Sequence, residues 1–273
     1  MDYSTLIGNS FEYTKDGLTK NLATWIILII LTILPVIPFI LVLILMLPSM
    51  MTGTMPDIPT LIGGFVIAFI IAIILGAFYM GYLLKILRGE VPLPAVSGFG
   101  KLFIDGIKYL VIEIIYFLPV LIILAITAGA AIMSALPIIM AMEAEPDFDA
   151  LMPILGGVIL GVLLALIVAF ILGLFAIIGV VRFARTGKIG EAFNFSAIMA
   201  AIGKIGWGSY ILALIIMGVL VAIVQVVVSI IPYIGGLIQL IISPFIAVFV
   251  ARYVCLLYES ADETVVPSTT PSP

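Results

Sequence analysis

The sequence contains no histidine and a single cysteine, Cys255, and both shortages exclude whole classes of protein. Without histidine there is no His-based metal site, no Ser-His or Cys-His catalysis and no zinc-peptidase helix. A lone cysteine has no intramolecular partner, which excludes a secreted domain held by disulfides. The chain also lacks a phosphate-binding glycine loop. We therefore expect no cofactor, no bound metal, no nucleic acid partner and no enzymatic activity.

Charge is also scarce. Only 10% of the 273 residues are charged and 64% are hydrophobic, with a mean hydropathy of +1.43. A soluble domain has about 25% charged residues, so this composition excludes a soluble or a disordered chain. Six apolar stretches are each long enough to cross a ~30 Å hydrocarbon core as a helix. They cover residues 22–47, 61–84, 109–133, 153–181, 207–230 and 233–258. We predict an all-α, polytopic bundle of six transmembrane helices in three hairpins, forming one membrane domain over 1–258.

Lys and Arg are absent from one side of the predicted membrane. All 11 fall before the odd-numbered spans or at the ends of the even-numbered ones, whereas the opposite loops carry only acidic charge, such as Asp57 and Glu143. Basic loops stay in the cytoplasm, so we predict a multi-pass protein of the cell membrane with both termini inside. The same basic face predicts contact with anionic lipids of the bilayer. The polar stretch 259–273 is predicted to be a disordered cytoplasmic tail.

The segments before spans one, three and five share an apolar stripe at helical spacing, with a Lys beside it. This pattern favours an amphipathic helix lying in the headgroup layer before each hairpin. The alternative is an extension of the following span, bent at Gly17, Gly106 or Gly206. The stripes consist of Tyr3, Leu6, Ile7, Phe11 and Leu18; of Val96, Phe99, Phe103, Ile107 and Leu110; and of Phe195, Ile198, Met199, Ile202 and Ile205.

The even-numbered spans also resemble one another. Phe78 precedes Lys85, Phe175 precedes Arg182, and Phe245 precedes Arg252, by seven residues in each case. This spacing suggests an internal repeat of three units in one orientation, each made of an approach helix, a span, an outer turn and a second span. Such units would be related by an axis along the membrane normal, as in parallel-repeat transporters.

Glu113 is the single acidic residue inside a predicted span. It follows Lys108 by five residues and so lies roughly 7–8 Å along the helix, at about 1.5 Å per residue. A carboxylate inside the membrane is a candidate functional group. Alternatively, it lies near the inner interface and pairs with Lys108, Lys85 or Arg182.

Two glutamines and a row of small residues are further candidates. Gln225 and Gln239 each lie seven residues from Pro232, which marks a tight outer turn, so they reach the same depth and could form an interhelical hydrogen bond. They are either structural or part of a polar patch on a substrate path. The small residues Gly157, Gly161, Ala165, Ala169 and Gly173 recur at every fourth position, a helix-packing stripe for another span or a second subunit.

A run of motifs follows span two: Gly81-Tyr82, Lys85, Arg88-Gly89, Leu93-Pro94, Leu102-Phe103 and Asp105-Gly106-Ile107-Lys108. This series resembles an uncharacterised family of archaeal and bacterial multi-span membrane proteins, a domain of unknown function, over roughly residues 5–260. Ala95-Val96 stands where that family usually has an acidic pair. The resemblance implies the architecture and a prokaryotic origin, and no activity.

Three functional hypotheses follow from the sequence. The first is a non-enzymatic integral membrane protein with a membrane-organising role, which could form a homo-oligomer. The second is a transporter or lipid-handling protein with a path between the hairpin repeats. The third is a membrane enzyme, which the missing catalytic residues disfavour.

Overall fold

The computed structural model describes residues 2–54, 57–141 and 148–263, and every regular element in these ranges is helical. Six helical stretches are long and apolar enough to cross a membrane, as predicted: Leu22–Ser49, Ile58–Leu87, Phe99–Leu136, Met152–Thr186, Trp207–Ser229 and Gly235–Ala261. The chain divides into two compact units. The first joins Met1–Leu110 to Ile178–Pro273, and the second is Val111–Ile177.

The regular elements of the described residues are nine α-helices and two short 3₁₀ helices. In chain order they are α1 (Tyr3–Thr19), α2 (Leu22–Ile33), η1 (Leu34–Val36), α3 (Ile37–Met51), α4 (Ile58–Leu87), α5 (Phe99–Ala141), α6 (Phe148–Thr186), η2 (Ile189–Phe193), α7 (Phe195–Ile205), α8 (Trp207–Ser229) and α9 (Gly235–Glu263).

The first predicted span is broken into α2 and α3 by the turn η1. Pro35 lies in this turn, where its ring and missing N–H disfavour a regular α-helix. Pro38 follows within the first turn of α3, a position that proline tolerates. Proline does not break every helix, since Pro119 lies within α5 and Pro244 within α9.

The predicted approach helices differ in outcome. Before spans one and five the chain forms separate helices, α1 and α7; α7 ends at Gly206, whose φ of +90° is one that glycine adopts readily. Before span three the prediction of a separate helix is wrong, because α5 runs unbroken from Phe99 through the span. Gly106 does not act as a hinge there. It lies inside α5 and brings the helix against the backbone of α4.

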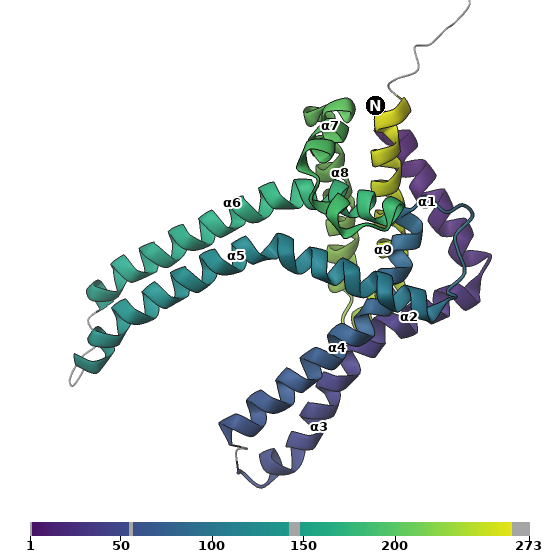
Figure 1. Ribbon diagram of the computed structural model, residues 1–273. Coiled ribbons are helices and arrows are strands. Elements are labelled where there is room, and N and C mark those ends of the chain that lie inside the picture. The colour runs from purple at the N-terminus through teal and green to yellow at the C-terminus, as the bar shows by residue number, and fades with distance from the viewer. Residues whose placement is uncertain (1, 55–56, 142–147, 264–273) are drawn as a thin grey trace, which may run out of the picture. The chain divides into compact units, whose positions relative to one another are not determined.

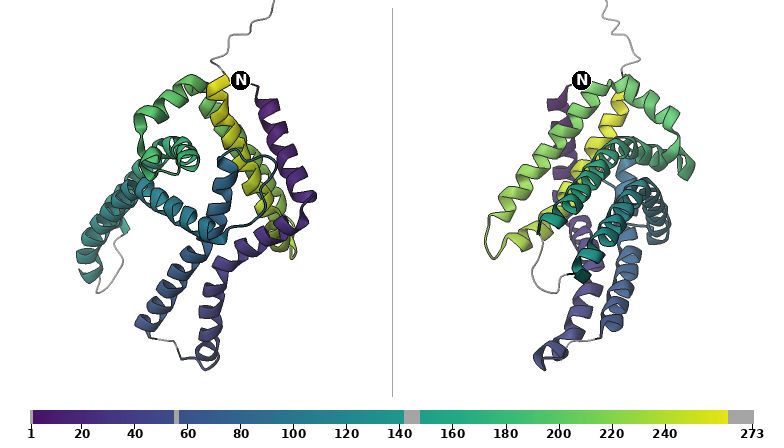
Figure 2. Two further views of the ribbon diagram at one scale, coloured as in Figure 1. Left: turned by 45° about the vertical axis from the view of Figure 1, so that its right-hand side comes forward. Right: turned by 90° about the vertical axis from the view of Figure 1, so that its left-hand side faces the viewer.

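Helix α1 lies lengthwise along α9, with the chain's N-terminus beside the C-terminal end of α9 (Figures 1 and 2). Its inner face buries Leu6 and Leu18 together with Ser10 and Thr14. The two buried hydroxyls are satisfied within the helix, because Ser10 donates to the Leu6 carbonyl and Thr14 to the Ser10 carbonyl, each at 2.7 Å. The predicted apolar stripe of α1 therefore packs at least partly on protein.

Helices α4 and α5 cross at two glycines with their backbones in contact. A Cβ added at Gly81 would lie 1.9 Å from the Leu102 carbonyl oxygen, and one at Gly106 would lie 1.8 Å from the Ala77 carbonyl oxygen. Ala77 and Gly81 lie one turn apart on α4, as Leu102 and Gly106 do on α5. The two small residues thus meet reciprocally, and no side chain larger than hydrogen fits at either position.

The second unit is the hairpin formed by the parts of α5 and α6 between Val111 and Ile177, which run side by side (Figures 1 and 2). Within it, a Cβ at Gly161 would lie 2.2 Å from the Thr127 hydroxyl oxygen. The acidic residue Glu143 of the predicted outer loop lies outside the described residues.

The C-terminal helix is longer than the sequence predicts. The predicted disordered tail begins at residue 259, whereas α9 continues to Glu263. Two interactions explain the extension: Ala261 is buried, and Glu259 forms an ion pair with Arg185 of α6. The remainder of the predicted tail, 264–273, lies outside the described residues.

Candidate functional site

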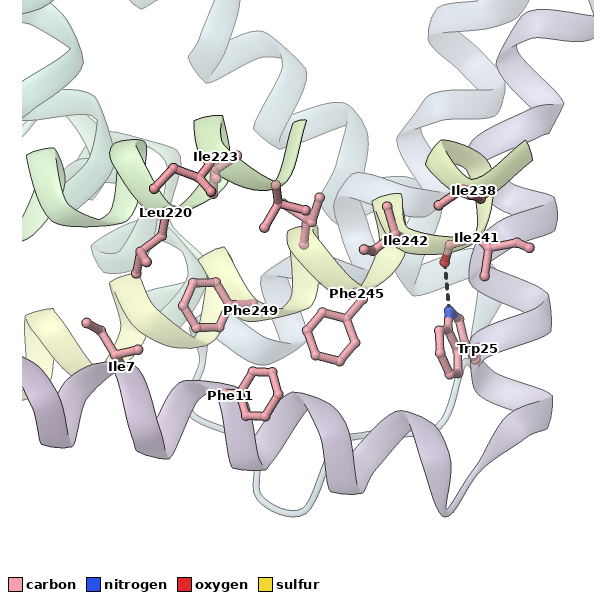
Figure 3. Close-up of a pocket in the computed structure, with 13 residues that line it drawn as sticks. Ile7, Phe11, Trp25, Leu220, Ile223, Ile238, Ile241, Ile242, Phe245 and Phe249 are labelled. Carbon is pink, nitrogen blue, oxygen red and sulfur yellow. Dashed lines mark hydrogen bonds between the residues drawn. The ribbon is translucent and has the colours of Figure 1, made fainter. Parts of the chain in front are cut away.

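An apolar groove lies between α1, α2, α8 and α9 in the first unit (Figure 3). Its volume is about 690 Å³, and its lining contains no charged side chain. The aromatic rings come from three helices: Phe11 lies 5.7 Å from Phe245, and Trp25 lies 6.5 Å from Phe245, between ring centroids. The remaining wall consists of Ile7, Leu220, Val221, Ile223, Val224, Ile238, Ile241, Ile242, Ile246 and Phe249.

The one polar side-chain group in the groove's lining, the indole N–H of Trp25, already has a partner. The indole N–H of Trp25 donates to the Ile241 carbonyl at 3.0 Å, the bond marked in Figure 3. The groove follows α9 from Ile238 to Phe249, a length of about 16 Å at ~1.5 Å per residue. That is about half of a ~30 Å hydrocarbon core. The groove therefore offers dispersion contacts to an aliphatic chain and nothing to a polar substrate.

A second feature of the first unit is a junction of paired charges at the C-terminal ends of α4, α6 and α9. Arg88 of α4 forms an ion pair with Asp105 of α5, with 2.5 Å between nitrogen and oxygen. The Arg88 side chain is 20% exposed and that of Asp105 is 11% exposed. Arg88 also donates from Nε to the Ala184 carbonyl at 2.9 Å. Arg88, at the C-terminal end of α4, thus contacts both α5 and α6.

Arg185 makes a corresponding link between α6 and α9. Its guanidinium donates to Glu259 at 2.6 Å and lies 5.0 Å from the centroid of the Tyr258 ring. Gly89, at a φ of +89°, completes this contact from the end of α4, because its Cβ position lies 3.1 Å from the Glu259 carboxylate. A side chain at residue 89 would be strained by its φ and would crowd the ion pair.

Arg182 pairs with Glu191 of η2, which also accepts a hydrogen bond of 3.4 Å from the Asn194 amide. The donation from Arg182 holds the pKa of the Glu191 carboxyl below its usual range. Asn194 in turn caps α7 by accepting from the Ala197 N–H at 3.2 Å. The Nε of Arg182 is buried and has no hydrogen-bond partner among the described residues.

Arg252 of α9 is stabilised by an aromatic ring. It lies 4.8 Å from the centroid of Tyr13 on α1, a cation–π contact. The Tyr13 hydroxyl donates to the Glu90 carbonyl at 2.8 Å, and burial raises the pKa of this phenol. Through these contacts α1 joins the junction.

The motif after span two contributes the loop between α4 and α5. The buried Tyr82 donates from its hydroxyl to the Pro94 carbonyl at 3.0 Å, and Lys85 donates to the Ser97 carbonyl at 2.9 Å. Leu93 lies against Gly17 of α1, where an added Cβ would lie 2.5 Å from the Leu93 Cβ. The side chains of Tyr82 and Lys85 therefore bind backbone carbonyls of the loop, which is a structural role. Within the described ranges no group of three or more Cys, Asp or Glu residues could hold a metal ion.

The structure places Glu113 on an exposed face of α5, in the second unit. Two of its three predicted partners are engaged elsewhere: Lys85 with loop carbonyls and Arg182 with Glu191. Its role stays a prediction.

The structure does not join Gln225 to Gln239. Gln225 is exposed on α8, Gln239 is half-buried on α9, and the described residues show no hydrogen bond between them. Equal distance from Pro232 sets the depth of two residues in a hairpin. It leaves their rotation about each helix axis free, and this rotation decides whether they meet.

The small-residue stripe of α6 divides into different environments. Gly161 meets Thr127, and Ala165 is 3% exposed. Gly157 is exposed, and no atom would lie within 4 Å of a Cβ at Gly173. At Gly161 the partner is the other helix of the same hairpin.

The groove could not be predicted from the sequence. Its residues are isoleucine, valine, leucine and phenylalanine, which are abundant in every span, and their convergence depends on how α1 packs on α9. Trp25 was the one signal, because the chain has only two tryptophans.

The long apolar helices define the class: a multi-pass, all-α membrane protein. The chain belongs to the family described as "Protein of unknown function (DUF4013)", whose model matches residues 64–233. The match includes the α4–α5 crossing and α8, and it leaves α1 and the whole of α9 outside. No curated protein and no solved structure matches the chain.

Proposed function

We propose that this protein organises the lipids of the cell membrane without catalysing a reaction, by holding a lipid acyl chain in the groove between α1, α2, α8 and α9. The observation that carries the proposal is the groove itself, about 690 Å³ in volume and without a charged side chain in its lining. Lipid-handling and membrane organisation are then two aspects of one binding event.

An acyl chain is the occupant that the surroundings favour. Helices α8 and α9 are both long and apolar enough to span a bilayer, so the groove would open into the hydrocarbon layer. Lipid acyl chains make up most of the hydrocarbon layer. The aromatic edges of Phe11, Phe245 and Phe249 would pack on methylene groups by dispersion, each contact being weak and their sum large.

Photo-crosslinking tests the proposal. Phosphatidylcholine with a diazirine in its acyl chain should label peptides of α8 and α9 in proteoliposomes. Val224→Trp would fill the groove and remove this label. Val226→Trp is the matched control, because Val226 lies on the same helix, is 57% exposed and does not line the groove. Equal labelling of both variants would contradict an acyl chain in the groove.

The proposed orientation has both termini in the cytoplasm, and the complete segregation of Lys and Arg supports it. Cysteine labelling of intact cells tests it at exposed positions with ordinary backbone. Ile230→Cys, in the turn after α8, should react with an impermeant maleimide, whereas Lys188→Cys, after α6, should react only in lysed cells. Native Cys255 is buried and provides the background. The reverse pattern would invert the topology.

A transport path is the second candidate, and one cavity favours it. In the second unit, a space of about 430 Å³ between α5 and α6 is lined in part by Thr127, Ser134 and Gly157. If the path carries protons, Glu113 is the candidate proton-binding carboxylate, at an exposed position of α5 outside this lining. Proteoliposomes loaded with a pH-sensitive dye should then show a proton flux that Glu113→Gln abolishes. A wild-type flux no greater than that of empty liposomes would exclude this function.

A further inference from the structure

A small basic cavity lies between the ends of α6, α7 and α9, apart from the apolar groove. Its volume is about 280 Å³, near the low end of ligand pockets, and its wall includes Arg182, Lys204 and Tyr258. The rest is formed by alanines: Ala197, Ala200, Ala201 and Ala261. Small side chains leave the space open, and two cations face a common volume.

The two cations differ in how far they are already neutralised. Arg182 donates from one terminal nitrogen to Glu191, which partly neutralises its charge. Lys204 is exposed and forms no ion pair among the described residues. The side chains of Arg182, Lys204 and Glu191 together carry a net positive charge. An anion bound in the cavity would neutralise this remaining charge.

The surface beside the cavity is apolar. Helix α7 buries Ile198, Ile202 and Ile205 against the protein, while Phe195 and Met199 are 46% and 50% exposed. An amphipathic helix with a lysine in its last turn and an exposed apolar face suits the boundary between headgroups and acyl chains. A bound anion would therefore lie at headgroup level.

We propose that Arg182 and Lys204 form a site for a phosphate group, either the headgroup phosphate of an anionic lipid or free inorganic phosphate. Arg182 offers its guanidinium group and Lys204 its ammonium group, and both are charge-assisted donors to phosphate oxygens. The site is independent of the acyl-chain groove, and either could exist without the other.

Binding of a short-chain phosphatidic acid to the detergent-solubilised protein tests the site, with inorganic phosphate as a second ligand. Lys204→Gln should weaken binding about tenfold, which corresponds to the loss of one charge-assisted hydrogen bond. Lys188→Gln removes the same charge from an exposed position outside the cavity and should change the affinity less than about twofold. Ala200→Leu should also weaken binding, since it fills the cavity without changing any charge.

The relative affinities for the two ligands distinguish a lipid headgroup from free inorganic phosphate. Tight binding of the lipid with weak binding of phosphate, both dependent on Lys204, identifies a lipid headgroup. Equal binding of both ligands with the same dependence identifies free phosphate. Equal losses in Lys204→Gln and Lys188→Gln would show diffuse surface attraction and overturn the site, as would an unchanged affinity in Ala200→Leu. These measurements do not involve Val224, so the site and the groove can fail separately.

Discussion

The two compact units of this chain hold apolar helices together by different means. In the first unit, paired arginines lock helix ends, and glycines bring the backbones of α4 and α5 into contact. In the second unit, Gly161 contacts the side chain of Thr127, and Glu113, the one acidic residue with a described side chain, is exposed. Helices in lipid gain no hydrophobic driving force from association, so such specific contacts decide stability. We expect the first unit to tolerate far less change.

The largest effect is expected from Asp105→Ala. This substitution leaves Arg88 largely buried and without its carboxylate partner, and breaking a buried pair costs about 3–5 kcal/mol. Thermal unfolding in detergent measures the loss. Asp16→Ala is the control, because Asp16 pairs with Lys20 on an exposed face of α1 and its loss should be undetectable. Similar melting temperatures for the two variants would contradict a structural role for the junction.

Gly106→Ala should have the next largest effect. The new methyl group would lie 1.8 Å from the Ala77 carbonyl oxygen, so the two helix backbones must separate. Overpacking of this kind costs about 1–3 kcal/mol, and contact with backbone places this substitution at the upper end. Gly100→Ala lies on the same helix with no atom within 4 Å and should be neutral or slightly stabilising. An unchanged melting temperature in Gly106→Ala would contradict a stabilising role for the α4–α5 crossing.

A smaller loss, about 1 kcal/mol, is expected for Gly161→Ala in the second unit. The obstacle there is the Thr127 side chain, which can move at less cost than a backbone. Thr127→Ala should therefore restore the stability of Gly161→Ala, whereas no side-chain change can restore Gly106→Ala. Melting temperatures of the single and double variants decide this. A loss larger than that of Gly106→Ala would reverse the proposed ranking of the units.

The smallest effect concerns pH. Arg182 lowers the pKa of Glu191 in the folded protein, so this pair stabilises the fold above the ordinary glutamate pKa and is lost as pH falls through the lowered value. The difference in melting temperature between wild type and Glu191→Gln should therefore be constant from pH 7 to about pH 5 and shrink toward pH 3. The side chain is 28% exposed, so the difference will be small. A difference that grows on acidification would contradict the pairing.

Much of the fold could be predicted from the sequence, because apolar length and the absence of charge determine which segments span a bilayer. The six long helices follow from that rule alone. The interruption at Pro35 and the separation of α7 from α8 at Gly206 also have local causes in proline and glycine chemistry. Local signals did not predict the behaviour of Gly106, since a glycine can serve as a hinge or as a contact, and only the neighbouring helix decides.

The candidate sites were less predictable for a related reason. Arg182 pairs with a residue nine positions away, but Arg185 pairs with Glu259, 74 positions away, and Trp25 bonds to Ile241, 216 positions away. No spacing rule connects residues so distant. Gln225 and Gln239 show the converse, because equal distance from a turn predicts a common depth but not the direction in which each side chain points.

Native mass spectrometry of the protein released from lipid nanodiscs tests the central claim most directly, since it counts retained lipids and subunits together. We predict that wild type and Val226→Trp retain lipid and that Val224→Trp retains at least one molecule fewer per chain. Retention of the same number by all three, or lipid-free wild type, would contradict a lipid-holding function. A lipid-free dimer would instead assign the groove to a second copy of the chain.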